Sequence, residues 1–262
     1  AKGETRAHVD FKGLKTLWFN TGSLCNIECA NCYIESSPTA DHVVYLSPED
    51  MKPYLDEIDA MGLGSVEIAF TGGEPYMNPD ILRLSEMALE RGHELLVLTN
   101  AMRPMMRPRL QKGLLDLQER FGAKMTLRIS LDHFTAREHD RERGAGSFDI
   151  ALKGMRWLTD HKFPLHIAGR AMFSESEVDA RRGYAALIDA QGWDIDAHNP
   201  AQTILFPEMD ARLDVPEITT DCWAILDVHP DSMMCATSRM VVRRKGVGKT
   251  VVLACTLLWD DP

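Results

Sequence analysis

The stretch Leu24-Cys-Asn-Ile-Glu-Cys-Ala-Asn-Cys-Tyr33 decides how the rest of the chain is interpreted. Its cysteines, Cys25, Cys29 and Cys32, are spaced C-x3-C-x2-C, so one tight loop offers three thiolates. Three thiolates suit three irons of a [4Fe–4S] cluster and leave the fourth iron open to another ligand. The spacing therefore predicts an iron–sulfur site whose open iron takes part in chemistry.

Two other uses of these cysteines compete with that interpretation. A structural zinc ion needs four ligands, usually in two separated pairs, and no Cys or His nearby obviously completes such a set. A thioredoxin-like Cys29-x-x-Cys32 pair would leave Cys25 unexplained. A non-catalytic zinc or iron–sulfur binding protein is the remote alternative to an enzyme.

Composition narrows the class of protein. The chain has 262 residues and a formal net charge of -10, with a sequence pI near 5.4. Its length suffices for one large α/β domain with a buried core. The acidic balance argues against a nucleic-acid partner bound mainly by phosphate neutralisation. The first residues are polar, and no apolar run is long enough to span a bilayer, so we expect a cytoplasmic protein without disulfides or a membrane partner.

Short β-type runs alternate with amphipathic helical runs, which is the pattern of a parallel sheet with crossover helices. We expect strands at Thr16–Asn20, Ser65–Phe70, Glu94–Leu98, Lys124–Ile129, Leu165–Ala171 and Thr203–Phe206. We expect helices capped by Ser47 and by Asn78, with Gly62 and Gly92 past their ends, and further helices at Pro108–Phe121, Phe148–His161 and Glu175–Ala190. These units predict an α/β fold, a partial (βα)6 TIM-like barrel, within residues 1–206.

From Pro207 the alternation stops, and the chain passes through an acidic stretch and Pro216. Beyond it, two β-type runs, 240–244 and 251–254, flank the Lys245-Gly-Val-Gly-Lys249 turn. Glycines in a short turn between such runs predict a β-hairpin. We expect residues 207–262 to form a small C-terminal extension of the barrel.

Polar residues follow the expected strands, at the barrel face where chemistry is found. The second strand leads into Thr71-Gly72-Gly73-Glu74-Pro75, whose glycines allow a close backbone approach and whose Glu74 can accept from an ammonium group. Asn100, Ser130 and Arg170 follow later strands. Structural explanations also exist: an ordinary βα turn for the glycines, helix caps for Asn100 and Asp132, and a surface ion pair for Arg170.

Together these residues resemble the radical S-adenosylmethionine (radical SAM) superfamily. Cys25-x3-Cys29-x2-Cys32 matches its cluster motif, and Gly72-Gly73-Glu74-Pro75 matches its second motif. The resemblance covers residues 16 to 206 and itself implies a partial (βα)6 barrel. It implies that a [4Fe–4S] cluster reductively cleaves S-adenosyl-L-methionine to a 5′-deoxyadenosyl radical, which abstracts hydrogen from a substrate. It also implies a one-electron reductant such as flavodoxin or ferredoxin.

The resemblance assigns roles to single residues. Cys25, Cys29 and Cys32 would hold the cluster, and Gly72, Gly73 and Glu74 would bind the SAM ammonium group. Asn100 and Ser130 would face the ribose, and Arg170 the SAM carboxylate. The family usually has an aromatic residue just before the third cysteine; here that residue is Asn31, and Tyr33 follows the cysteine instead. Tyr33 is therefore the cofactor-binding candidate of this loop, and its contact with adenine is left open.

The run from Ser130-Leu-Asp132-His133 to Ser147-Phe148 resembles members that carry a SPASM or twitch extension, many of which modify peptides or proteins. The resemblance favours a peptide or protein substrate, with a small metabolite or cofactor precursor as the alternative. A structural explanation of the same run makes Ser147 the N-cap of the next helix and the charged residues before it a solvated loop.

The C-terminal hairpin resembles the first half of a SPASM or twitch unit. Cys235 and Cys255 flank it, and Cys222 is a candidate third ligand for a second iron–sulfur cluster. Three buried thiols without a metal are the alternative. The turn glycine lies further from the second cysteine than is usual, and the later cysteines of a full unit are absent. We therefore expect the sequence to be truncated at its C-terminus.

Overall fold

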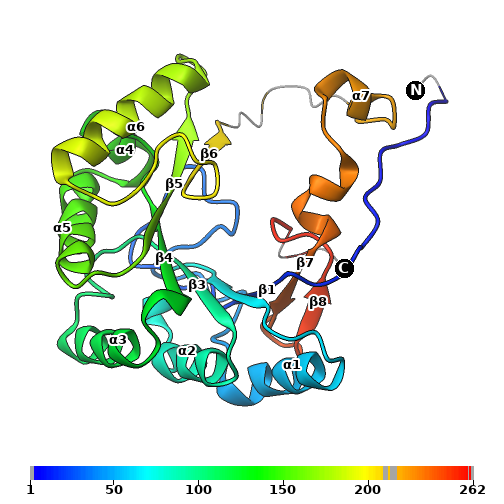
Figure 1. Ribbon diagram of the computed structural model, residues 1–262, viewed down its shortest axis with the longest axis horizontal. Coiled ribbons are helices and arrows are strands. Elements are labelled where there is room, and N and C mark those ends of the chain that lie inside the picture. The colour runs from blue at the N-terminus through cyan, green and yellow to red at the C-terminus, as the bar shows by residue number, and fades with distance from the viewer. Residues whose placement is uncertain (1–2, 209–211, 213–216, 259, 261–262) are drawn as a thin grey trace.

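One eight-stranded sheet forms the centre of the molecule (Figure 1). The computed structural model describes residues 3–208, 212, 217–258 and 260. The strands run in the order β6-β5-β4-β3-β2-β1-β7-β8. Their bounds are β1 Thr16–Asn20, β2 Glu67–Thr71, β3 Glu94–Thr99, β4 Met125–Ser130, β5 Leu165–Ala171, β6 Thr203–Pro207, β7 Ser238–Val242 and β8 Val251–Leu253.

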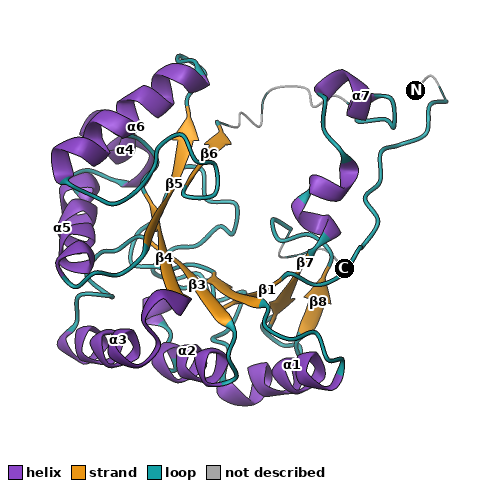
Figure 2. Ribbon diagram, viewed as in Figure 1, coloured by secondary structure: helices purple, strands orange, loops and turns teal. Residues whose placement is uncertain are grey.

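Helices cover the convex side of the curled sheet (Figure 2). They are α1 Pro48–Ala60, α2 Ile81–Glu90, α3 Pro108–Phe121, α4 Ala136–Arg143, α5 Ser147–Asp160 and α6 Glu177–Gln191. The short α7, Cys222–Leu226, stands apart from this layer (Figure 2). Short 3-10 turns complete the set at Pro75–Met77, Gly122–Lys124, Pro230–Ser232 and Met234–Ala236. Each of the first five strands is followed by at least one helix, so the βα alternation expected from the sequence is confirmed.

Strands β1 to β6 are parallel to one another, and the sheet is open. The expected partial barrel is thus confirmed. Because neighbouring residues of a strand point to opposite faces, each strand contributes to two different environments. Leu127 and Ile129 of β4 are buried in the core beneath the helices. Arg128 and Ser130 therefore face the concave side, where Trp18, Leu96 and Met240 belong to a second, smaller apolar cluster.

The N-cap expected from the sequence is confirmed for α1 and wrong for α2. Ser47 forms a full capping box with Asp50 at the start of α1, as its sequence predicts. Asn78 was expected to cap α2, but that helix begins at Ile81 and has Asp80 at its N-cap. Asn78 instead donates from Nδ2 to the carbonyls of Thr21 and Leu46. Its amide therefore bridges loops, a role that local sequence does not reveal.

The segment before α5 also differs from the structural expectation. Residues 136–143 form a helix, α4, and not a solvated loop. Ser147 is the first residue of α5, whose N-cap is Gly146 in a left-handed conformation. The Ser147 hydroxyl donates to Asp140 Oδ1 at 3.1 Å and is buried. Asp140 thus takes the capping function that was expected of Ser147, because it also accepts from the amides of Gly146 and Phe148.

The C-terminal hairpin exists, but it continues the main sheet. β7 pairs in parallel with β1, and β8 pairs antiparallel with β7. The acidic stretch and Pro216 that precede it lie largely outside the described residues. The division of the chain at residues 206 and 207 stays a prediction. None of the helices in the described part of the chain has the length and apolar character needed to cross a membrane.

Candidate active site at the carboxyl ends of the strands

The cysteine loop leaves β1 and is tied down along its length. The amide of Thr21 donates to Thr71 O at 2.8 Å, and the amide of Cys25 donates to Ser37 O at 3.0 Å. Cys25 is 5% exposed, whereas Cys29 and Cys32 are half-buried. Burial raises the pKa of the Cys25 thiol to about 12 and also raises the pKa of Cys29. Burial thus favours the protonated form of Cys25 and Cys29 in the absence of a bound cluster.

Gly72 and Gly73 bring the β2 loop into direct contact with the cysteine loop. The Gly73 amide donates to Gly22 O at 2.8 Å, and the Glu74 amide donates to Leu24 O at 3.1 Å. A Cβ atom on Gly73 would lie 2.3 Å from Leu24 O, and one on Gly72 would lie 2.5 Å from Gly22 O. Both glycines are required by this close approach of two backbones. The sequence predicted a close approach to a ligand, and the structure adds the cysteine loop as a partner.

Glu74 is fixed at the bottom of the same loop. Its side chain is buried, and its two oxygens accept from Thr99 Oγ1 at 2.8 Å, from the Asn100 amide at 2.9 Å and from the Tyr76 amide at 3.1 Å. Burial raises the pKa of this carboxyl, while the bonds from Asn100, Thr99 and Tyr76 oppose that rise. The orientation of the carboxylate is therefore set by β3 as well as by its own loop.

Asn100 joins β3 to the cysteine loop. Its Nδ2 donates to Asn26 Oδ1 at 3.0 Å and approaches the Cys25 sulfur at 3.9 Å, and its Oδ1 accepts from the Met102 amide. Asn100 is buried. The helix-cap alternative is wrong for Asn100, because α3 has Arg107 at its N-cap. Asn100 instead bonds within its own turn and approaches a proposed cluster ligand. Its contact with ribose stays a prediction.

A buried ion pair stands beside Cys29, and the sequence did not single it out as a pair. Arg143 at the end of α4 holds Asp132 in a bidentate contact, with Nε to Oδ2 at 2.8 Å and Nη2 to Oδ1 at 3.3 Å. Burial alone would raise the pKa of Asp132, but Arg143 and Arg170 lower it. Arg143 also opposes the burial that raises the pKa of Cys29. The site thus offers positive charge to thiolates.

The remaining candidates lie at the concave face or on the loop. Ser130 ends β4 on the concave face and is half-buried. Arg170 of β5 donates its backbone amide to Asp132 O, and its Nε is buried without a partner among the described residues. Tyr33 is partly exposed, with its hydroxyl 3.4 Å from Thr71 Oγ1. Arg170 thus keeps a free donor for an anionic group, while the ligands of Ser130 and Tyr33 stay predictions.

His139 packs behind the Arg143 ion pair. It is fully buried, and both ring nitrogens lack a partner within the described structure. Burial, reinforced by Arg143, lowers the pKa of His139 to about 4. Its ring meets the Phe148 ring edge-on, at a centroid distance of 5.5 Å. At neutral pH it is an uncharged histidine that fills space beside charged groups.

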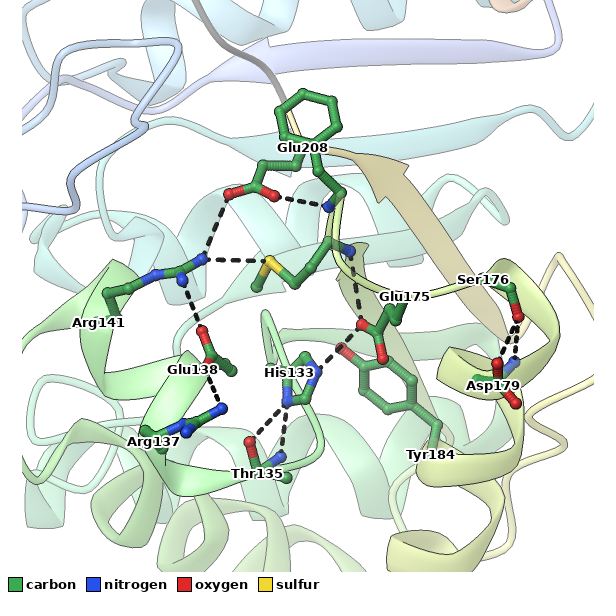
Figure 3. A network of polar contacts seen from close by, with 12 residues as sticks. His133, Thr135, Arg137, Glu138, Arg141, Glu175, Ser176, Asp179, Tyr184 and Glu208 are labelled. Carbon is green, nitrogen blue, oxygen red and sulfur yellow. Dashed lines mark hydrogen bonds and ion pairs between the residues drawn. The ribbon is translucent and has the colours of Figure 1, made fainter.

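A polar network ties the loops that follow β4, β5 and β6 (Figure 3). His133 Nε2 lies 3.1 Å from Glu175 Oε1, and Arg141 Nη2 lies 3.3 Å from Glu208 Oε1. The other oxygen of Glu208 accepts from the Phe173 amide at 2.7 Å. The rim on this side of the barrel is therefore cross-linked from α4 to the end of β6.

The second cysteine group is spread over three segments. Cys235 and Cys255 line one large cavity of about 1000 Å³, together with apolar side chains such as Trp223 and Leu226. Cys222 belongs to α7, and its sulfur accepts from the Thr219 amide at 3.4 Å. Two of the three cysteines therefore share a cavity, and the second cluster stays a prediction.

The donor set fits the implied cofactors. Within the described residues, no group of His, Cys, Asp and Glu side chains is gathered closely enough to hold a single metal ion. A [4Fe–4S] cluster has a different requirement, because each iron takes its own thiolate. Cys25, Cys29 and Cys32 supply three such thiols from one loop, with Arg143 and Arg170 placed to offset the charge at Cys29. The buried Nδ2 of Asn20 and Nε of Arg170 leave further donors for a polar ligand.

Part of this chain is similar in sequence to parts of curated proteins. It is 34% identical over 195 residues to the antilisterial bacteriocin subtilosin biosynthesis protein AlbA of Bacillus subtilis, covering 72% of this chain and 41% of that protein. It is 26% identical over 144 residues to the AdoMet-dependent heme synthase of Methanosarcina barkeri, covering 55% of this chain and 38% of that protein. The chain thus spans about two fifths of the length of these relatives.

A solved structure and a family model agree with the fold. The chain superposes on Streptococcus suis SuiB bound to the precursor peptide SuiA with a TM-score of 0.64 and 12% identity, covering 95% of this chain and 61% of that one. The model of the Radical SAM superfamily matches residues 19–180, which include the cysteine loop, Gly72 to Glu74, Asn100, Ser130 and Arg170. Since that match covers more than half of its length, this chain belongs to the radical SAM superfamily.

Proposed function

We propose that the chain reductively cleaves S-adenosyl-L-methionine to a 5′-deoxyadenosyl radical, and that this radical abstracts hydrogen from a peptide or protein substrate. The observation that carries this proposal is the contact between the two motifs. The amides of Gly73 and Glu74 donate to carbonyls of the cysteine loop, at Gly22 and Leu24. The Glu74 carboxylate is close enough to Cys25 to contribute to its raised pKa, and such closeness of the two motifs supports a cofactor that bridges them.

Each part of the site has a role in this proposal. Cys25, Cys29 and Cys32 would hold three irons, and the bound cluster together with SAM would supply one-electron cleavage of the S–C5′ bond and removal of a substrate hydrogen atom. Gly72, Gly73 and Glu74 bind the SAM ammonium group. Thr99 and the Asn100 amide hold the Glu74 carboxylate in one orientation, so little ordering remains to occur when the ligand binds.

The ligand's other groups are assigned to the concave face. Arg170 binds the SAM carboxylate, since its buried Nε has no partner among the described residues. Asn100 and Ser130 face the ribose, and Tyr33 stands at the adenine side. The barrel must also hold one substrate C–H bond in place and keep other groups away, because a reactive carbon radical attacks almost any C–H bond that it meets.

A peptide or protein substrate is supported by the relatives. AlbA is named for the biosynthesis of a bacteriocin, and the SuiB structure contains a precursor peptide. A small cofactor precursor is the second candidate, because the heme synthase of Methanosarcina barkeri is also similar. We favour the peptide, since AlbA shares the higher identity over the larger part of this chain.

Electron supply and location follow from the proposed reaction. A low-potential cluster needs a one-electron donor such as flavodoxin or ferredoxin. We place the protein in the cytoplasm, where such donors work and where thiols stay reduced. All six cysteines are free thiols in the structure, which fits that compartment.

A second iron–sulfur cluster is proposed at Cys222, Cys235 and Cys255. Cys235 and Cys255 already line the same cavity, which supports a shared ligand. Arg6 and His8 also line this cavity, and both belong to the N-terminal arm, residues 3–15 before β1. A cluster here would join the arm and the hairpin region through one group.

Anaerobic reconstitution tests the main proposal. The protein is loaded with iron and sulfide, reduced chemically and supplied with SAM, and 5′-deoxyadenosine is measured. We expect product from the wild type and none from Cys25→Ala. A zinc-loaded, colourless wild type that never cleaves SAM would overturn the proposal, as would product from the Cys25→Ala variant. The reaction is then repeated with a peptide or with a small metabolite. The compound that loses a hydrogen atom identifies the substrate class.

A further inference from the structure

The last turn of α4 touches the middle of the cysteine loop. The Ala30 amide donates to Glu142 O at 2.8 Å, and Asn31 Nδ2 donates to Glu142 Oε2 at 2.7 Å. Ala30 and Asn31 are the two residues between Cys29 and Cys32. One residue of α4 therefore holds the segment that joins two of the three thiols.

Helix geometry explains why Glu142 can make both contacts. The last four carbonyls of an α-helix have no partner within the helix. α4 ends at Arg143, so the Glu142 carbonyl is one of these four and is available to Ala30. The Glu142 side chain is 4% exposed, and a buried carboxylate needs hydrogen-bond donors. Asn31 supplies one, and Arg141 Nε lies 3.6 Å from the other oxygen.

The helix is itself anchored, so it can act as a support. Arg143 is joined to Asp132 at the end of β4 by two hydrogen bonds. Asp140 accepts from the Gly146 amide at 2.7 Å, from the Phe148 amide at 2.9 Å and from the Ser147 hydroxyl. These bonds connect α4 to a central strand and to α5. Through α4, Glu142 therefore links the cysteine loop to the sheet.

We propose that Glu142 is a positioning residue for the [4Fe–4S] cluster, acting through Ala30 and Asn31. The inference rests on the proposed function, since the cluster is the group to be positioned. Asn31 stands where the family usually has an aromatic residue, so its amide donor makes this anchor a feature of the present chain. Glu142 fixes the separation and direction of Cys29 and Cys32 before the cluster arrives.

Four variants separate this role from general stability. Glu142→Ala removes the carboxylate, and Asn31→Ala removes its donor. Glu142→Gln keeps a side-chain oxygen that can accept from Asn31, so it should rescue the contact. Glu138→Ala is the matched control, because Glu138 lies one turn earlier in α4 and pairs with Arg137 and Arg141 on the rim.

The first measurement uses the metal-free protein. We expect hydrogen exchange of the amides between residues 26 and 33 to become about tenfold faster in Glu142→Ala and Asn31→Ala, since one charge-assisted hydrogen bond is lost. Glu142→Gln should stay within about threefold of the wild type, and Glu138→Ala should match it. Equal exchange in the wild type and Glu142→Ala would overturn the proposal.

The second measurement uses the reconstituted protein. The rate of iron loss after desalting and the electron paramagnetic resonance spectrum of the reduced cluster are compared among the variants. We expect about tenfold faster iron loss and an altered spectrum for Glu142→Ala, with both restored by Glu142→Gln. Unchanged loss and an unchanged spectrum in Glu142→Ala overturn this inference alone. A wild type that takes up no cluster overturns the proposed function together with it.

Discussion

The two cysteine groups of this chain differ in how the fold treats them. Cys25, Cys29 and Cys32 share one loop that is contacted by β2, by Asn100 directly after β3 and by α4. Cys222, Cys235 and Cys255 come from three separate segments, and the cavity lined by Cys235 and Cys255 is bordered mainly by apolar side chains. The first group is surrounded by hydrogen bonds and cations, whereas the second lies at the edge of the sheet. The barrel itself therefore forms the first site, whereas the proposed second site would depend on its ligand to bring the three cysteines together.

Removing thiols from each group gives the largest expected effects. Cys25→Ala should abolish SAM cleavage, because one iron loses its ligand. Replacing both Cys235 and Cys255 with Ala should remove about half of the iron and leave SAM cleavage measurable, since each [4Fe–4S] cluster carries the same iron count. Iron and 5′-deoxyadenosine are measured on the same samples. An unchanged iron content in the double variant would rule out the second cluster and make the contrast between the groups complete.

Two glycine substitutions compare the packing of the same regions. Gly73→Ala places a Cβ atom 2.3 Å from Leu24 O, so a backbone must move, and we expect a loss of about 3 kcal/mol in the free energy of unfolding. Gly248 lies in the hairpin turn, and a Cβ there meets nothing within 4 Å. Gly248→Ala should therefore change stability by less than about 0.5 kcal/mol. Urea unfolding measures both, and similar costs would show that the cysteine loop is no more tightly packed than the turn.

Sequence reasoning was most successful where the signal is local. The six barrel strands follow from short apolar runs, and the cysteine loop follows from its spacing, because both depend on residues close together in the chain. The helix α4 was missed because its sequence is almost entirely charged and lacks an apolar stripe. The addition of β7 beside β1 joins segments far apart in the chain, which periodicity cannot reveal.

The site was predicted in the same uneven way. Gly73 and Glu74 could be found from their motif, but the partners of Glu142 and Arg143 lie in the cysteine loop and at the end of β4. Such pairs depend on where α4 packs after the sheet has formed. The polar run 139–143 indicated function through its resemblance to peptide-modifying members of the family. Only the structure shows that Glu142 and Arg143 hold the cysteine loop and Asp132 by hydrogen bonds.

The buried histidine beside the first group predicts a pH dependence. Burial and Arg143 lower the pKa of His139 to about 4 in the folded protein, below its ordinary value near 6.5. The unfolded chain therefore binds more protons between these values, and stability must fall as pH drops through that window. Between pH 7 and pH 5 we expect His139 to account for a loss of about 2 kcal/mol. Urea unfolding at both pH values measures this loss.

A glutamine at the same position provides the comparison for His139. His139→Gln cannot take up a proton, so the loss between pH 7 and pH 5 should shrink by that amount. His198→Gln changes a histidine on the surface and should leave the loss as in the wild type. If His139→Gln and the wild type lose the same stability between pH 7 and pH 5, protonation of His139 does not cause the pH dependence.

The smallest effect is expected at the rim, where the first region meets the end of β6. Arg141 is 53% exposed and lies 3.3 Å from Glu208, so Arg141→Ala should cost less than about 1 kcal/mol in urea unfolding. Of its other carboxylate partners, Glu138 keeps Arg137 and Glu142 keeps Asn31 when the arginine is removed. We expect the rate of iron loss to match that of the wild type, because Arg141 holds the rim and Glu142 holds the loop. Faster iron loss in Arg141→Ala, approaching that of Glu142→Ala, would mean that Arg141 also supports Glu142 and, through it, the cysteine loop.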